Sequence, residues 1–149
     1  MLVDTSALYA LVVAEDINHD AARSCFEQLR LAEEELLSTN YVLLECASLI
    51  QRRHGFKAAQ RLLMKMAELL DVIWIEQEAH RQAVSLWTKA ESRALSLVDC
   101  ANFAVMRALG IRHAVAFDAH FAQAGFVMLP HADRVSERRG PYRIRRARQ

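Results

Sequence analysis

The alternation of short apolar runs with helix-like segments is the feature that most limits how this chain of 149 residues can fold. Strands separated by helices form βαβ units, whose strands run parallel and are covered by helices. The sequence therefore predicts an α/β domain with a small, mainly parallel sheet of about four or five strands. The expected strands are residues 2–4, 36–38, 72–75, 114–117 and 126–129.

Segments with helical spacing of apolar residues fill the intervals between these strands. Trp74 lies in a predicted strand and Trp87 in a predicted helix, and we expect both to belong to the core. The expected helices are residues 5–13, 41–53, 56–70, 78–91, 96–110 and 119–124, with another one that is capped by Asn18 or Asp20.

Charge divides the chain into an acidic body and a basic tail. The net charge is +1, but residues 134–149 hold seven Arg and one acid, whereas residues 1–133 hold 12 basic and 17 acidic residues. We therefore predict one folded domain over residues 1–130 and a basic, Arg-rich tail over residues 131–149 that need not be ordered.

The cysteines and the N-terminus indicate the compartment. The chain has three cysteines and no C-x-x-C motif, which argues against a disulfide framework and a structural zinc site. It has no basic segment at its start and no uncharged apolar run of about 18 residues, so we expect neither a signal peptide nor a transmembrane helix. We expect a cytoplasmic protein with no membrane partner.

Four acidic residues differ from the others because each is the only formal charge in an apolar stretch. None of them has a Lys or Arg three or four residues away, so none can form a local helical ion pair. A carboxylate buried without a partner costs several kcal/mol, on the order of the penalty for burying any lone ion. They are Asp4 in residues 1–14, Glu45 in 41–50, Asp99 in 94–106 and Asp118 in 113–132.

Helix capping explains three of these acids taken singly. Asp4 and Asp118 precede predicted helices, and Ser96 and Asp99 have the spacing of a capping box. Glu45 has no such explanation, because it lies well inside its predicted helix, where no backbone N–H lacks a partner.

The positions of the four acids favour a shared site over four separate caps. Asp4 and Asp118 end strands, and Glu45 and Asp99 lie in the early turns of helices that begin on the same side of the sheet. Carboxylates gathered there would repel each other and raise each other's pKa. A divalent cation removes that repulsion, and an all-oxygen set of ligands suits Mg²⁺ or Mn²⁺. Such ions support in-line displacement at phosphate.

The stretches that carry these acids resemble the acidic motifs of PIN-domain ribonucleases, above all those of the bacterial VapC-type toxins. The resemblance spans the chain from Leu2 to about Pro130. Four motifs in this order and at these spacings are far more specific than any one of them. They are MLVDTSALYALV, STNYVLLECASLI, LSLVDCANFAVMRALGI and AVAFDAHFAQAGF.

The resemblance implies a PIN-like three-layer α/β/α fold. It also implies an endoribonuclease that depends on Mg²⁺ or Mn²⁺ and leaves a 3′-hydroxyl and a 5′-phosphate. It maps the family's catalytic, metal-binding acids onto Asp4, Glu45, Asp99 and Asp118. The partners that it implies are an RNA substrate, a second copy of the chain in a homodimer, and a small antitoxin that blocks the site.

Four further residues are candidates for supporting the metal or contacting the substrate. The family's hydroxyl after the first Asp maps to Thr5 or Ser6. Asn102 lies one helical turn beyond Asp99 and could bind substrate or fix a carboxylate. Some relatives carry an additional acid where this chain has His120, which leaves open whether one or two metal ions bind. A partly exposed surface position at a helix start is the simpler explanation of His120.

The basic tail has two interpretations. An Arg-rich segment can bind RNA phosphates through counterion release, and it could offset the repulsion between RNA and an acidic body. A solvated tail without a partner would have the same composition. The residues expected to contact RNA are Arg138, Arg139, Arg143, Arg145 and Arg146.

Three other functions remain open on the sequence alone. A receiver-like phosphoacceptor is disfavoured, because Asp4 is followed by Thr5 and Ser6 rather than by a second acid. A PIN-fold module that binds RNA or protein without cleavage would need only a nuclease assay to identify it. A PIN nuclease outside toxin–antitoxin systems would lack a small neighbouring gene for a partner.

Overall fold

A single sheet of five parallel strands lies at the centre of the computed structural model, which describes residues 1–131 apart from the side chain of Ala67. Leu2 of the central strand pairs with Leu37 on one side and with Ala114 on the other. This confirms the predicted parallel sheet, whereas Arg138 and the other tail arginines lie outside the described residues. The strands, in sheet order, are β3 (Asp71–Ile73), β2 (Leu37–Thr39), β1 (Leu2–Val3), β4 (His113–Val115) and β5 (Val127–Leu129).

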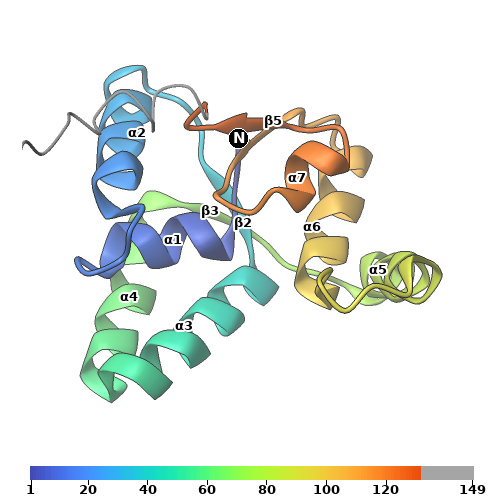
Figure 1. Ribbon diagram of the computed structural model, residues 1–149, viewed down its shortest axis with the longest axis horizontal. Helices are drawn as coiled ribbons and strands as arrows, with labels where there is room; N and C mark the ends of the chain where they lie inside the picture. The colour runs from blue at the N-terminus through green and yellow to red at the C-terminus, as the bar shows by residue number, and fades with distance from the viewer. Residues whose placement is uncertain (132–149) are drawn as a thin grey trace, which may run out of the picture.

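Helices cover both faces of this sheet, which confirms the expected α/β/α layers (Figure 1). One face carries α1 (Thr5–Val12), α2 (His19–Leu31), α3 (Asn40–His54) and α4 (Phe56–Leu69). The other face carries α5 (Gln77–Ala90), α6 (Leu97–Ala108) and α7 (His120–Gln123). No helix within residues 1–131 combines the length and the apolar character needed to cross a membrane.

The central strands supply apolar side chains to both faces. Val3 and Val115 pack among residues of α1 to α4, whereas their neighbours Leu2 and Ala114 pack with the apolar side chains of α6 and α7. Successive residues of a strand point to opposite sides, so a strand with helices on both sides must be apolar at every position. This explains the continuous apolar runs in the sequence.

Helix α6 is the most deeply buried helix of the fold. Its residues from Asp99 to Met106 are all buried, because α6 packs between the sheet and α5. Its N-terminus is fixed by a complete capping box, in which the Ser96 hydroxyl accepts from the Asp99 N–H and the Asp99 carboxylate accepts from the Ser96 N–H. A helix held in this way is a rigid support for the acid in its first turn.

The expected burial of the two tryptophans was wrong. Trp74 is 72% exposed and Trp87 is 47% exposed. Trp74 follows β3, the edge strand of the sheet, and Ala83 is the residue of α5 that is buried. Both tryptophans lie in outer elements with no further layer to pack against, which the local apolar pattern does not reveal.

Candidate functional site

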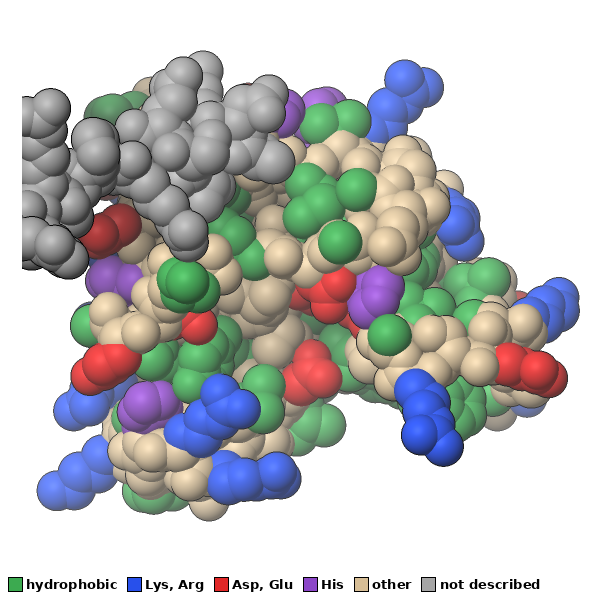
Figure 2. All heavy atoms as spheres, viewed as in Figure 1, with side chains coloured by type: hydrophobic (Ala, Val, Ile, Leu, Met, Phe, Trp, Pro, Cys, Tyr) green, Lys and Arg blue, Asp and Glu red, His purple; other side chains and the backbone are tan. Residues whose placement is uncertain are grey.

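A pocket of about 370 Å³ at the carboxyl ends of the strands is lined by all four acids singled out in the sequence. Asp4 follows β1, Asp118 follows β4, Glu45 projects from α3, and Asp99 projects from the first turn of α6. Parallel strands end at the same edge of a sheet, so residues far apart in the sequence meet there. Figure 2 shows acidic side chains and a histidine gathered in a hollow at the centre of this face.

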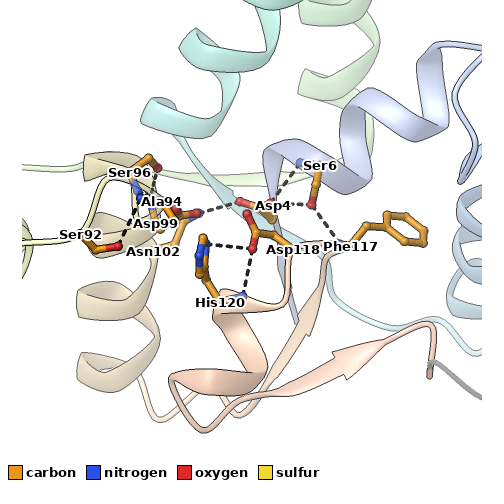
Figure 3. Close-up of polar contacts among 10 residues, drawn as sticks. All are labelled: Asp4, Ser6, Ser92, Ala94, Ser96, Asp99, Asn102, Phe117, Asp118 and His120. Atoms are coloured by element: carbon orange, nitrogen blue, oxygen red, sulfur yellow. Dashed lines mark hydrogen bonds and ion pairs between the residues drawn. The ribbon is translucent and has the colours of Figure 1, made fainter. Parts of the chain in front are cut away.

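Asp4 is enclosed and hydrogen-bonded on both oxygens. It is 4% exposed. Its Oδ2 accepts from the N–H of Ser6 at 3.0 Å and from the Ser6 hydroxyl at 2.7 Å, and its Oδ1 accepts from the Asn102 side-chain amide at 3.2 Å (Figure 3). Burial raises the pKa of Asp4 to about 6, with a further rise from the Asp99 charge, although the Ser6 hydrogen bonds oppose the shift. Ionised Asp4 is therefore costly unless a cation lies nearby.

Asn102 fixes the position of the Asp4 carboxylate from the core. Asn102 is fully buried, and its Oδ1 accepts from the Thr39 hydroxyl at 3.1 Å. The Thr39 Oγ1 accepts in turn from the N–H of Val42 at 3.2 Å, as the cap of α3. This chain of contacts joins the ends of β1 and β2 to α6. Of the two roles considered for Asn102, the geometry matches the fixing of a carboxylate.

The two hydroxyl residues after Asp4 support different acids. The Thr5 hydroxyl donates to Glu45 Oε2 at 2.6 Å. The Ser6 hydroxyl donates to Asp4, and it accepts from the N–H of Phe117 at 3.0 Å. Thr5 therefore orients the acid of α3, whereas Ser6 links the end of β1 to the segment after β4.

The acids that cap helices are the same residues that line the pocket. Asp4 caps α1, Asp99 completes the box of α6, and Asp118 Oδ1 accepts from the N–H of His120 at 2.9 Å. Each cap uses only part of a carboxylate's capacity to accept hydrogen bonds. Within the described residues, Oδ1 of Asp99, Oδ2 of Asp118 and Oε1 of Glu45 have no hydrogen-bond donor.

Asp99, Asp118 and His120 form the tightest group. One ligand atom from each of these residues lies within 4.8 Å of the others, whereas Asp4 and Glu45 line the pocket without joining this group. His120 Nδ1 is 2.9 Å from Asp118 Oδ1, but the ring is not aligned for a hydrogen bond. The buried Nδ1 atom thus has no hydrogen-bond partner among residues 1–131.

These residues fit a divalent cation. In the part of the chain that the structure describes, no Lys or Arg forms an ion pair with any of the four acids, and the ion pairs present lie elsewhere on the surface or involve His120. Carboxylates that converge without a cation raise each other's free energy. Oxygen donors with free lone pairs, next to an imidazole nitrogen that lacks a partner, are a donor set for a hard or borderline divalent ion.

Tyr9 and Arg53 line the same pocket, although neither was predicted from the sequence. Tyr9 lies one helical turn after Thr5, and Arg53 lies two turns after Glu45 on the same face of α3. Helical spacing from the predicted residues was the signal that could have identified them.

The amino-acid sequence of this chain is similar to those of known proteins. Residues 1–127 match the PIN domain. VapC20 of Mycobacterium tuberculosis, described as a 23S rRNA-specific endonuclease, is 34% identical over 128 residues, which cover 85% of this chain and 95% of VapC20. A VapC ribonuclease of Aquifex aeolicus is 23% identical over 129 residues, which cover 84% of this chain and 92% of that protein.

Solved structures agree with this sequence similarity. The crystal structure of VapC20 from Mycobacterium tuberculosis, described as a Sarcin-Ricin loop cleaving toxin, matches with a TM-score of 0.75 over 85% of this chain and 95% of VapC20. The structure of VapBC2 from Rickettsia felis, bound to a promoter DNA fragment, matches with a TM-score of 0.60 at 14% identity, over 85% of this chain and 95% of that one. At that identity the likeness concerns the fold alone.

Proposed function

We propose that this chain, which belongs to the PIN-domain family, is a divalent-cation-dependent endoribonuclease of VapC type and the toxin of a toxin–antitoxin pair. The observation that carries the proposal is the pocket at the strand ends, where four carboxylates converge without an ion-paired Lys or Arg among residues 1–131. Its substrate is RNA, as it is for VapC20. Its further partners are a small antitoxin that covers the pocket and a second copy of the chain, and its compartment is the cytoplasm.

Mg²⁺ or Mn²⁺ is the cofactor in this proposal. Asp99, Asp118 and His120 would hold the ion, and Asp4 and Glu45 would complete its surroundings from the β1 and α3 sides. Such an ion supplies Lewis-acid stabilisation of phosphate oxygens and a more acidic water. The role of the protein is to keep the donor atoms in place and free of other partners.

The supporting residues act by fixing those donor atoms. Asn102 and Ser6 hold the carboxylate of Asp4, and the Thr5 hydroxyl holds Oε2 of Glu45. Glu45 Oε1 has no donor among residues 1–131, so it can accept a hydrogen bond or a proton in the pocket. The groups are anchored on buried elements, so they are oriented before substrate arrives.

Cleavage assays with two matched variants test the function. The parent should cleave RNA with Mg²⁺ or Mn²⁺ and lose this activity in a chelator, and Asp4→Asn and Asp99→Asn should both be inactive. Asp71→Asn, at an exposed position on the edge strand, is the control and should cleave like the parent. Full cleavage by both site variants would reject the site, and RNA binding by an intact parent without cleavage would indicate a binding module.

The basic tail is proposed to assist RNA binding. Its arginines lie outside the described residues, and the charge of the sequence is what supports their role: seven Arg in residues 134–149 follow an acidic body. Deletion of residues 134–149 should weaken RNA binding and flatten its dependence on salt. Unchanged binding at every salt concentration would remove the tail from the proposal.

A further inference from the structure

We infer that Arg53 and Tyr9 form a binding site for an RNA phosphate that flanks the scissile bond. The inference deepens the proposed function, because it rests on RNA as the ligand of the same pocket. It starts from the one Lys or Arg that lines this pocket within residues 1–131, which is Arg53.

Two helices present parallel stripes of side chains to the pocket. On α1 the stripe is Thr5 and Tyr9, and on α3 it is Glu45, Leu49 and Arg53. The stripes touch at both ends, through Thr5 and Glu45 at 2.6 Å and through Arg53 and Tyr9 at 3.1 Å. Glu45 and Arg53 are eight positions apart on the helix, a rise of roughly 12 Å along the axis. Arg53 therefore lies to one side of the acids.

The guanidinium of Arg53 is held without being neutralised. Its Nη1 donates to the Tyr9 hydroxyl at 3.1 Å, and its Cζ lies 5.5 Å from the centre of the Tyr9 ring. The Tyr9 hydroxyl also lies 3.3 Å from His54 Nε2, so it can accept from Arg53 while donating to His54. No carboxylate among the described residues forms an ion pair with Arg53. A phenol orients the guanidinium, and its remaining N–H donors and its charge stay available.

An anion is the ligand that this arrangement suits. Five carboxylates line the pocket, Asp16 in addition to the four site acids, and they repel a polyanion. A planar guanidinium binds phosphate oxygens through two donors at once, and phosphate is the anionic group that an RNA chain brings on either side of the cleaved bond. Arg53 thus binds the chain where the carboxylates alone would repel it.

The alternative is that Arg53 only stabilises the end of α3. Its neighbour Arg52 makes it possible to distinguish this structural role from RNA binding. Arg52, Arg53 and His54 all lie in the last turn of α3, where cations offset the helix dipole. Arg52 is exposed and shares that position, but it does not line the pocket. Arg52→Ala is therefore a matched control for Arg53→Ala, with the same charge change on the same helical turn.

RNA binding is measured by fluorescence anisotropy in the cleavage-silent Asp99→Asn background, with a labelled single-stranded RNA of mixed sequence. Arg53→Ala should weaken binding about tenfold and lower the slope of log K against log salt by about 0.7, the value for one phosphate contact on a single strand. Tyr9→Phe should give a smaller loss, and Arg52→Ala should change binding less than about twofold. Melting temperatures of the variants confirm that each one folds.

Equal effects of Arg53→Ala and Arg52→Ala would overturn the inference, and so would the absence of any RNA binding by the parent. Loss of affinity for a co-purifying protein with RNA affinity unchanged would also overturn it, because Arg53 would then be a protein contact. The proposed function fails separately: a parent that binds RNA through Arg53 but never cleaves it would support this site and reject the nuclease.

Discussion

Asp4 and Asp118 occupy equivalent places in the sequence and very different places in the molecule. Each follows one of two adjacent parallel strands, precedes a helix and accepts from the N–H two residues later. Asp4 is 4% exposed and accepts from Ser6 and Asn102. The side chain of Asp118 is 38% exposed, and among residues 1–131 it bonds only within its own turn. Asp4 follows the central strand and is enclosed by α1 and α6, but Asp118 precedes a helix of four residues near the surface. Similar local sequences thus produce one carboxylate that is costly to ionise and one that remains hydrated.

The largest expected effect is a loss of cleavage on substitution of Asp118, with almost no change in stability. Asp118→Asn should lower RNA cleavage by roughly 100-fold or more, since a ligand to a catalytic ion contributes several kcal/mol. Its free energy of unfolding should change by less than about 0.5 kcal/mol, because the position is partly exposed and an amide oxygen can still accept from the His120 N–H. Cleavage rates and urea unfolding measure both quantities. A large loss of stability would remove the contrast with Asp4.

Asp4→Asn should instead stabilise the metal-free protein near neutral pH. The pKa of Asp4 is raised from 3.8 to about 6, so the folded protein binds this proton more tightly than the unfolded chain does. The stability that Asp4 contributes is fully present below pH 3.8 and is lost as the pH rises through about 6. Removing the charge should therefore raise the free energy of unfolding by about 2 to 3 kcal/mol above pH 7, and by nothing at low pH.

The hydrogen bonds around Asp4 allow this substitution. The new amide can accept from Ser6 with its oxygen while its nitrogen donates to Asn102, whose amide turns over and then donates to Thr39. The buried Thr39 hydroxyl then accepts from Asn102 and Val42, and its proton loses its acceptor, which offsets about 1 kcal/mol of the gain. Unfolding curves in a chelator at several pH values test the prediction. Identical stability of parent and variant at neutral pH would show that the buried carboxylate carries no penalty.

The surroundings of Asp118 differ from those of Asp4 because His120 adds a nitrogen donor beside Asp118. A nitrogen donor favours Mn²⁺ relative to Mg²⁺, which prefers an all-oxygen shell. His120→Asp should therefore shift the ratio of the two affinities toward Mg²⁺ by about tenfold. Titration calorimetry with each ion measures the ratio, and His113→Gln at an exposed position on β4 is the control. An unchanged ratio would show that His120 is not a ligand.

The smallest expected loss of cleavage is at Thr5, the residue after Asp4, whose hydroxyl bonds to Glu45. Thr5→Val keeps the shape of the side chain and removes the hydrogen bond to Glu45, which should lower cleavage by roughly tenfold with a stability loss near 1 kcal/mol. Thr88→Val is the control, because within the described part of the chain the Thr88 hydroxyl bonds only to the Val84 carbonyl oxygen of its own helix. Equal effects of the two substitutions would mean that the Thr5 hydrogen bond does not orient Glu45.

Local patterns in the sequence predicted much of the fold. Continuous apolar runs predicted the strands, and capping residues predicted helix starts such as those after Asp4 and Ser96. Predicted boundaries differ from the observed ones by about one or two residues, as expected where helix and strand ends fray. The burial of Trp74 and Trp87 was not predictable in this way, because it depends on which elements lie outermost in the layers.

The sequence by itself determined the α/β class and the four isolated acids, since both follow from the spacing of apolar and charged residues along the chain. It did not determine the strand order β3-β2-β1-β4-β5, which alone brings Asp4 beside Asp118 and buries one of them. Tertiary structure also decided that Asn102 supports Asp4 and that Arg53 reaches Tyr9. The reason is physical: periodicity reports which side of an element is buried, whereas burial depth, hydrogen-bond partners and pKa depend on what packs against that side.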